Sequence, residues 1–168
     1  IISLLHAETG MEETELKKLR DQAAATGTSF DRILLNRGVD EEKVLKAFAT
    51  DLELEYWESL EGTQVPRGYV EIVPLSLARA YDMIAVGVHG RRLLVATAHP
   101  LDLHAQDDLA SLLPEGVDFV LAPRGEILEL LNRAFRHKAD GVDQALEDLE
   151  DTDIASLAAE IEESEDLL

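Results

Sequence analysis

Apolar residues recur at helical spacing through the first third of the chain, with polar residues between them. The stretch "MEETELKKLRDQAAATG" places Leu16 and Leu19 on one face and stops at Gly27. The next stretch, "TSFDRILLNRG", offers Ser29 as an N-cap and Gly38 as a C-terminal stop. Both segments are therefore predicted to be helices that bury one apolar face.

A third helix is predicted to begin at Asp40, whose side chain is suited to capping it. Its apolar positions near one face are Val44, Ala47, Phe48 and Leu52. A weak internal repeat is also present, because Gly10 and Gly38 lie 28 residues apart and each precedes acidic residues and a helix. Two copies favour a paired helical unit, since a solenoid needs about three or more repeats.

The pattern changes after a turn-rich connector that contains Gly62, Pro66 and Gly68. A short helix, with Pro74 in its first turn, precedes two apolar strands that meet at His89–Gly90, which is typical of a hairpin. A helix near Asp102, the strand "GVDFVLA" and a last helix then follow. The positions predicted to face inward in these two helices are Leu109, Leu112, Leu113, Ile127, Leu130, Leu131 and Phe135.

This order predicts an α+β fold with a small three-stranded sheet and helices packed on one face of it. We expect a helical subdomain with two helix-pair copies over residues 1–55 and a small α/β sandwich subdomain over 56–138. An acidic linker, partly helical or disordered, is expected over 139–168. Within it, Ile154, Leu157 and Ile161 have helical spacing, so that segment is either a frayed helix or a helix that docks on another body.

Charge is distributed unevenly along the chain. The net charge is −20, and residues 140–168 hold 12 acidic residues and no basic one, which leaves −8 for the rest. The chain therefore lacks the basic patch that nucleic acids or anionic membrane surfaces require.

Without cysteine, it has no disulfide and no thiolate metal site. No apolar run reaches the roughly 18 residues of a membrane span. Because Ile1 replaces a start methionine and no leader pattern follows, we expect a fragment without a signal peptide.

Two histidines and three aspartates gather in the stretch "HPLDLHAQDD", namely His99, Asp102, His104, Asp107 and Asp108. A zinc site needs three or four converging ligands, whereas Asp102 is placed to cap a helix. His104 and Asp108 are four residues apart, which allows one contact on a helix face. The favoured interpretation is capping and solvation; a metal site or an acid–base pair is the alternative.

The sequence contains none of the motifs GxxxxGK[ST], GxSxG, HExxH or GxGxxG. We therefore expect neither catalysis nor a bound cofactor in this chain. Arg91 and Arg92 follow the hairpin glycine, where they could meet an acidic partner or form a solvated tip. By elimination, the sequence indicates a binding or regulatory module.

The downstream half resembles the N-terminal domain of the type II secretion and type IV pilus assembly ATPases, the domain of general secretory pathway protein E. The positions that match that family's pattern are Pro74, Leu77, Ala78, Ala96, Ala98, Pro100, Asp102, Asp107, Asp108, Leu109 and Ile127. His99 stands where the family usually has an acid. The stretch "FDRILLNRGVDEEKVLKAFATDLELEYWESL" is similar to the helix pair of the same family.

The resemblance implies a non-catalytic domain that binds the cytoplasmic domain of an inner-membrane assembly protein and tethers the ATPase region of its own chain. It also implies a cytoplasmic location, peripheral at the inner membrane through that partner, and a monomer for this piece. The docking residues are expected in the first helical unit: Leu16, Leu19, Arg20, Arg32 and Arg37.

The alternative that the resemblance implies is a cyclic di-GMP sensor, since some family members bind this nucleotide through tandem helix-pair motifs. Its residues here would be Ile33, Leu34, Gly38, Val44 and Phe48. The family's motif begins Arg-Leu-Gly and ends in Gln, but those Arg, Gly and Gln positions fall on Ser29, Asp31 and Asp51. The loss of a cation and the gain of carboxylates disfavour a dianionic ligand.

Overall fold

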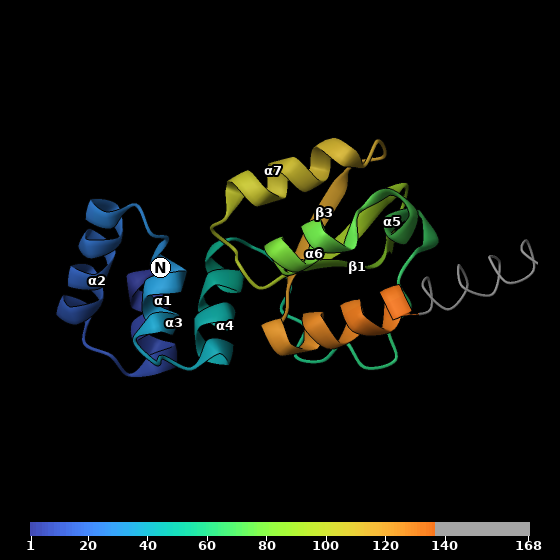
Figure 1. Cartoon of the computed structure of the whole chain (residues 1–168). Coiled ribbons are helices and arrows are strands. Elements are labelled where there is room, and N and C mark those ends of the chain that lie inside the picture. Colours follow the sequence, from blue (N-terminus) through green and yellow to red (C-terminus); the bar gives the residue numbers. More distant parts are fainter. Residues whose placement is uncertain (137–168) are drawn as a thin grey trace, which may run out of the picture. The chain divides into compact units, whose positions relative to one another are not determined.

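The N-terminal part of the computed structural model consists of four helices (Figure 1). Their bounds are α1 Ile2–Thr9, α2 Glu13–Thr26, α3 Phe30–Asn36 and α4 Glu41–Asp51. The structure describes residues 1–136. After α1 and after α3 the chain turns at a glycine with positive φ, Gly10 at 74° and Gly38 at 81°, a conformation that glycine adopts at little cost. The repeated glycine therefore marks the same turn in two successive helix pairs.

The starts of α3 and α4 are fixed in different ways. Asp40 caps α4, because its Oδ1 accepts hydrogen bonds from the backbone N–H groups of Glu42 at 2.9 Å and Lys43 at 3.4 Å. Ser29 occupies the N-cap position of α3, but its side chain makes no capping hydrogen bond. The first residue of α3, Phe30, is buried, so packing rather than a cap holds this helix start.

An apolar core lies between the four helices. Its buried residues are Ile2, Leu5, Leu16, Leu19, Ala23, Phe30, Ile33, Leu34, Val44, Leu45, Ala47, Phe48, Ala49 and Leu121. The rings of Phe30 and Phe48 meet edge to face, with 6.2 Å between centroids and 82° between planes. Leu121 comes from the sheet, so the helical part and the sheet share one core.

The sheet has three strands in the order β1-β2-β3 within the described residues. Their bounds are β1 Met83–His89, β2 Arg92–Thr97 and β3 Val117–Leu121. β1 and β2 form an antiparallel hairpin across Gly90 and Arg91, and β3 runs parallel to β2 after a crossover through α7, Leu103–Leu112. Helices and a mixed sheet together confirm the predicted α+β class.

The connector before the sheet covers the outer edge of β3. The backbone N–H of Leu121 donates to the carbonyl of Glu55 at 2.9 Å, and the N–H of Trp57 donates to the carbonyl of Leu121 at 2.8 Å. Tyr56 thereby forms a parallel bridge with Leu121. One edge of the sheet is thus paired by the chain itself.

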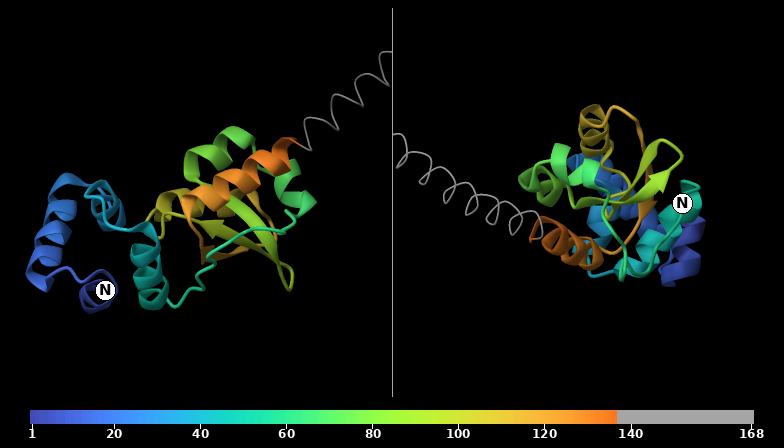
Figure 2. Two further views of the ribbon diagram at one scale, coloured as in Figure 1. Left: turned by 90° about the horizontal axis from the view of Figure 1, so that it is seen from below. Right: turned by 90° about the vertical axis from the view of Figure 1, so that its right-hand side faces the viewer.

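The helices gather on one face of the sheet, as predicted (Figure 2). Besides α7 they are α5 Arg67–Ile72, α6 Leu75–Tyr81 and the helix over 124–136. The Tyr81 hydroxyl donates to Asp108 of α7 at 2.7 Å, and Arg79 donates to Asn132 of the last helix at 2.8 Å. Because α6 contacts both neighbours, it lies between them.

Four predicted details are wrong. Leu52, predicted on the apolar face of its helix, follows the end of α4 and is exposed, and Gly68, predicted in the connector, lies in α5. Leu112 is exposed, whereas Leu109 and Leu113 are buried. The cause is the end of α7 at Leu112, after which the backbone leaves the helical path and Leu113 turns inward instead. Pro74 occupies the N-cap of α6 rather than its first turn, a position that suits its fixed φ of −63°.

Tyr69 ties α5 to the first strand, and this contact makes a testable prediction. Its hydroxyl is buried and donates to the Met83 carbonyl at 2.7 Å. Tyr69→Phe is expected to lower the free energy of unfolding by about 1 kcal/mol, because the carbonyl loses its partner. Burial raises the pKa of Tyr69 well above its ordinary value of 10.0. Above pH 10.0, the unfolded chain therefore loses a proton that the folded state keeps. The stabilisation is fully present below that pH and is lost as the pH rises above it.

Urea denaturation near neutral pH and again above the ordinary tyrosine pKa measures this linkage. Wild type is expected to lose more stability on the alkaline side than Tyr69→Phe. Tyr81→Phe is the comparison, since Tyr81 is only half-buried and the hydrogen bond to Asp108, rather than burial, is the main cause that raises its pKa. An equal alkaline loss in wild type and Tyr69→Phe would contradict the assignment.

The chain divides into two units, of which Ile1–Asn132 is the first. The subdomain boundaries predicted after residues 55 and 138 remain predictions. The acidic linker over 139–168, including Ile154, Leu157 and Ile161, lies outside the described residues. None of the helices within residues 1–136 combines the length and the apolar character that crossing a membrane requires.

Candidate functional site

The structure disperses the five polar residues of the stretch "HPLDLHAQDD". Asp102 caps α7 by accepting a hydrogen bond from the N–H of Ala105 at 3.2 Å. His104 and Asp108 form an exposed pair at 3.4 Å on the same helix. In residues 1–136 no group of three or more His, Cys, Asp or Glu side chains is placed to hold a metal ion. The capping interpretation of Asp102 is confirmed.

His99 belongs to a different constellation, which we call the ionic cluster: Asp82, His99 and Arg124. Asp82 Oδ2 lies 2.7 Å from His99 Nε2 and accepts a hydrogen bond from Arg124 Nε at 2.9 Å. The Asp82 side chain is only 8% exposed, whereas that of Arg124 is 56% exposed. A nearly buried carboxylate is thus held between an imidazole and a guanidinium.

The fold brings these three side chains together from separate elements. Asp82 ends α6 with φ of 49°, a left-handed conformation that Asp tolerates better than most residues. His99 follows the carboxyl end of β2, and Arg124 follows the carboxyl end of β3. The carboxyl ends of parallel strands meet at one edge, which is where ligand sites form in many α/β proteins.

The ionic cluster also reaches the helical part. The backbone N–H of Arg124 lies 3.3 Å and 3.4 Å from the two carboxylate oxygens of Glu41, which begins α4. A second link joins Arg32 of α3 to Asp102 at 3.5 Å. Asp82 Oδ1 and His99 Nδ1 are buried without a hydrogen-bond partner. The contacts of Arg124 with Glu41 and of Arg32 with Asp102 suit this region to holding the helices against the sheet.

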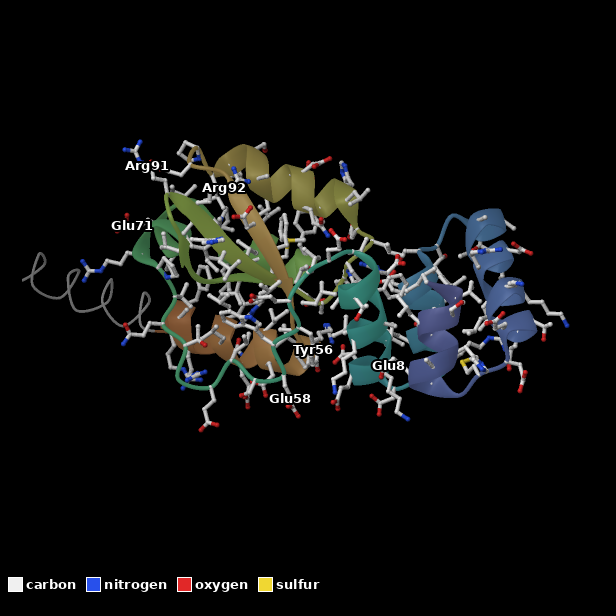
Figure 3. All side chains as sticks on the ribbon, turned by 180° about the vertical axis from the view of Figure 1, so that it is seen from behind. Glu8, Tyr56, Glu58, Glu71, Arg91 and Arg92 are labelled. Carbon is white, nitrogen blue, oxygen red and sulfur yellow. The ribbon has the colours of Figure 1, made fainter. Side chains whose placement is uncertain are left out.

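A second constellation surrounds Tyr56, which Figure 3 shows near Glu58 and Glu8. The Lys46 ammonium lies 5.7 Å from the centre of the Tyr56 ring. Burial, and then the carboxylates of Glu42 and Glu58, raise the pKa of Tyr56 to about 12. The hydrogen bond to Glu42 raises the pKa of Lys46. An acidic patch around one lysine gives this face a negative potential.

The predicted docking residues fall into two groups. Leu16 and Leu19 are buried in the helical core, so they hold α2 in place and do not reach the surface. Arg20 and Arg32 are exposed. Arg37 is exposed and donates to Gln22 of α2 at 3.5 Å. The structure therefore leaves three arginines at the surface of the helical part.

The residues predicted for cyclic di-GMP are mostly internal. Ile33, Leu34, Val44 and Phe48 all lie in the helical core. Gly38 forms the turn between α3 and α4. The four buried side chains are therefore not available at the surface of the helical part.

Asp31, which falls at the glycine position of the nucleotide-binding motif, is buried with an exposure of 1%. Neither of its carboxylate oxygens has a hydrogen-bond partner. A buried carboxylate without a partner is costly and repels an anion. The local structure thus adds to the obstacle that the sequence predicted for a dianionic nucleotide.

Sequence reasoning missed Asp82 and Tyr56. The signal for Asp82 was its place between a helix and a strand, where a left-handed turn residue is often an aspartate. Nothing in the local sequence pairs it with His99 or Arg124. Tyr56 stands only within the stretch that resembles the family's helix pair, and its bridge to Leu121 depends on a strand far along the chain.

Comparison with known proteins gives three similarities. The chain is 25% identical over 148 residues to the type IV pilus assembly ATPase PilB of Myxococcus xanthus strain DK1622 and spans 26% of that protein's length. The structure of MshE with cdg, that is, cyclic di-GMP, has a TM-score of 0.63 at 28% identity and covers 79% of this chain and 96% of that one. The N-terminal domain of XpsE has a TM-score of 0.63 at 23% identity, with coverage of 78% and 90%.

The family match includes the sheet that carries the ionic cluster. The MshEN domain pattern matches residues 52–141, more than half of the 168 residues. The similarity to XpsE, at 23% identity, concerns the fold. The predicted resemblance to the N-terminal domains of secretion and pilus assembly ATPases is therefore confirmed, and the chain belongs to the MshEN domain family.

Proposed function

We propose that this chain is the N-terminal docking domain of a type II secretion or type IV pilus assembly ATPase and performs no catalysis itself. The observation that carries the proposal is the extent of the match, since the chain corresponds to 26% of a pilus assembly ATPase. Its sequence contains no GxxxxGK[ST] motif, so nucleotide hydrolysis would belong to another region of the whole protein.

The proposed partner is the cytoplasmic domain of an inner-membrane assembly protein. Binding to it would place the protein at the cytoplasmic side of the inner membrane without insertion into the lipid. The helical part offers Arg20, Arg32 and Arg37 at its surface. In a chain with a net charge of −20, these arginines are suited to a partner with an acidic face.

Arg20 and Arg37 are the arginines to test, because Arg32 also helps to hold the fold through Asp102. The experiment titrates the 168-residue chain with the purified cytoplasmic domain of the assembly protein encoded beside it. Saturable binding is expected, and Arg20→Glu and Arg37→Glu should each weaken it by about tenfold. The matched control is Arg67→Glu on α5, which makes the same charge change elsewhere.

Absence of binding to the cytoplasmic domain would overturn the docking proposal. If all three substitutions weaken binding equally, the chain still docks on its partner, but the docking face does not lie at the predicted arginines. Circular dichroism of each variant separates a lost contact from a lost fold.

Cyclic di-GMP sensing is the second candidate, and the similarity to MshE with cdg favours it. Ser29 and Asp31 stand against it, since the motif has Arg and Gly there. Wild type is expected not to bind the nucleotide in a parallel calorimetric titration. Ser29→Arg combined with Asp31→Gly restores two motif positions and removes the buried carboxylate, so any gain of binding should appear there. Tight binding by wild type would replace docking with sensing as the leading function.

A further inference from the structure

We draw no further inference here: the strongest candidate, the acidic patch that Glu8 of α1, Glu42 of α4 and Glu58 of the connector form around Lys46 and Tyr56, is a cluster of carboxylates alone, and no other feature among residues 1–136 indicates what would bind there.

Discussion

Replacing Phe48 with alanine is expected to lower the free energy of unfolding by about 3–5 kcal/mol. Phe48 is buried in the helical core and meets the Phe30 ring edge to face at 6.2 Å between centroids. Removing it loses the burial of a large ring and leaves a cavity that the four surrounding helices fill only in part. Urea denaturation followed by circular dichroism measures the loss.

Leu52→Ala is the control for this substitution. Leu52 follows the last turn of the same helix and is exposed, so a loss of no more than about 1 kcal/mol is expected. Comparable losses at both positions would show that α4 does not bury Phe48 as the structure places it. The result also matters for tests of cyclic di-GMP binding. A Phe48 variant that does not bind the nucleotide is informative only if it still folds.

Asp82→Asn is expected to lower the free energy of unfolding by about 2–3 kcal/mol. Asparagine also tolerates the left-handed conformation at φ of 49°, so the substitution changes the charge and leaves the backbone unstrained. It removes the carboxylate that binds His99 and Arg124 at 2.7 Å and 2.9 Å. The loss stays below that of a fully buried pair, because Arg124 keeps access to water.

Asp118→Asn is the matched control, since Asp118 also lies between a histidine and an arginine. The two arrangements differ in exposure, because the Asp118 side chain is 40% exposed. An exposed ion pair contributes at most about 1 kcal/mol, so this control should lose much less stability. Equal losses of unfolding free energy at the two aspartates would contradict the view that burial makes the ionic cluster important for stability. If Asp82→Asn leaves binding to the partner unchanged, the ionic cluster has no part in partner recognition.

The local pattern of the sequence predicted most of the secondary structure. Alternation and spacing of apolar residues located the hairpin at His89–Gly90 and the helices that follow Asp40 and Asp102. Such features depend on residues within one or two turns of each other, so the sequence carries them directly. The resemblance to assembly ATPases likewise rested on residues in a continuous stretch. The exposure of Leu112, which the spacing predicted to face inward, depended on where the helix ends, and periodicity defines a helix end only within a few residues.

Contacts between distant residues were decided by the tertiary structure alone. Asp82 reaches His99 across 17 positions and Arg124 across 42, and no local pattern connects them. Leu16 and Leu19 were predicted at a docking face, but the packing of α2 on its neighbours buries them. Whether an amphipathic helix turns its apolar side to a core or to a partner depends on what else the fold brings to that side. For the same reason, only the tertiary structure shows that the connector covers the outer edge of β3, through the bridge between Tyr56 and Leu121.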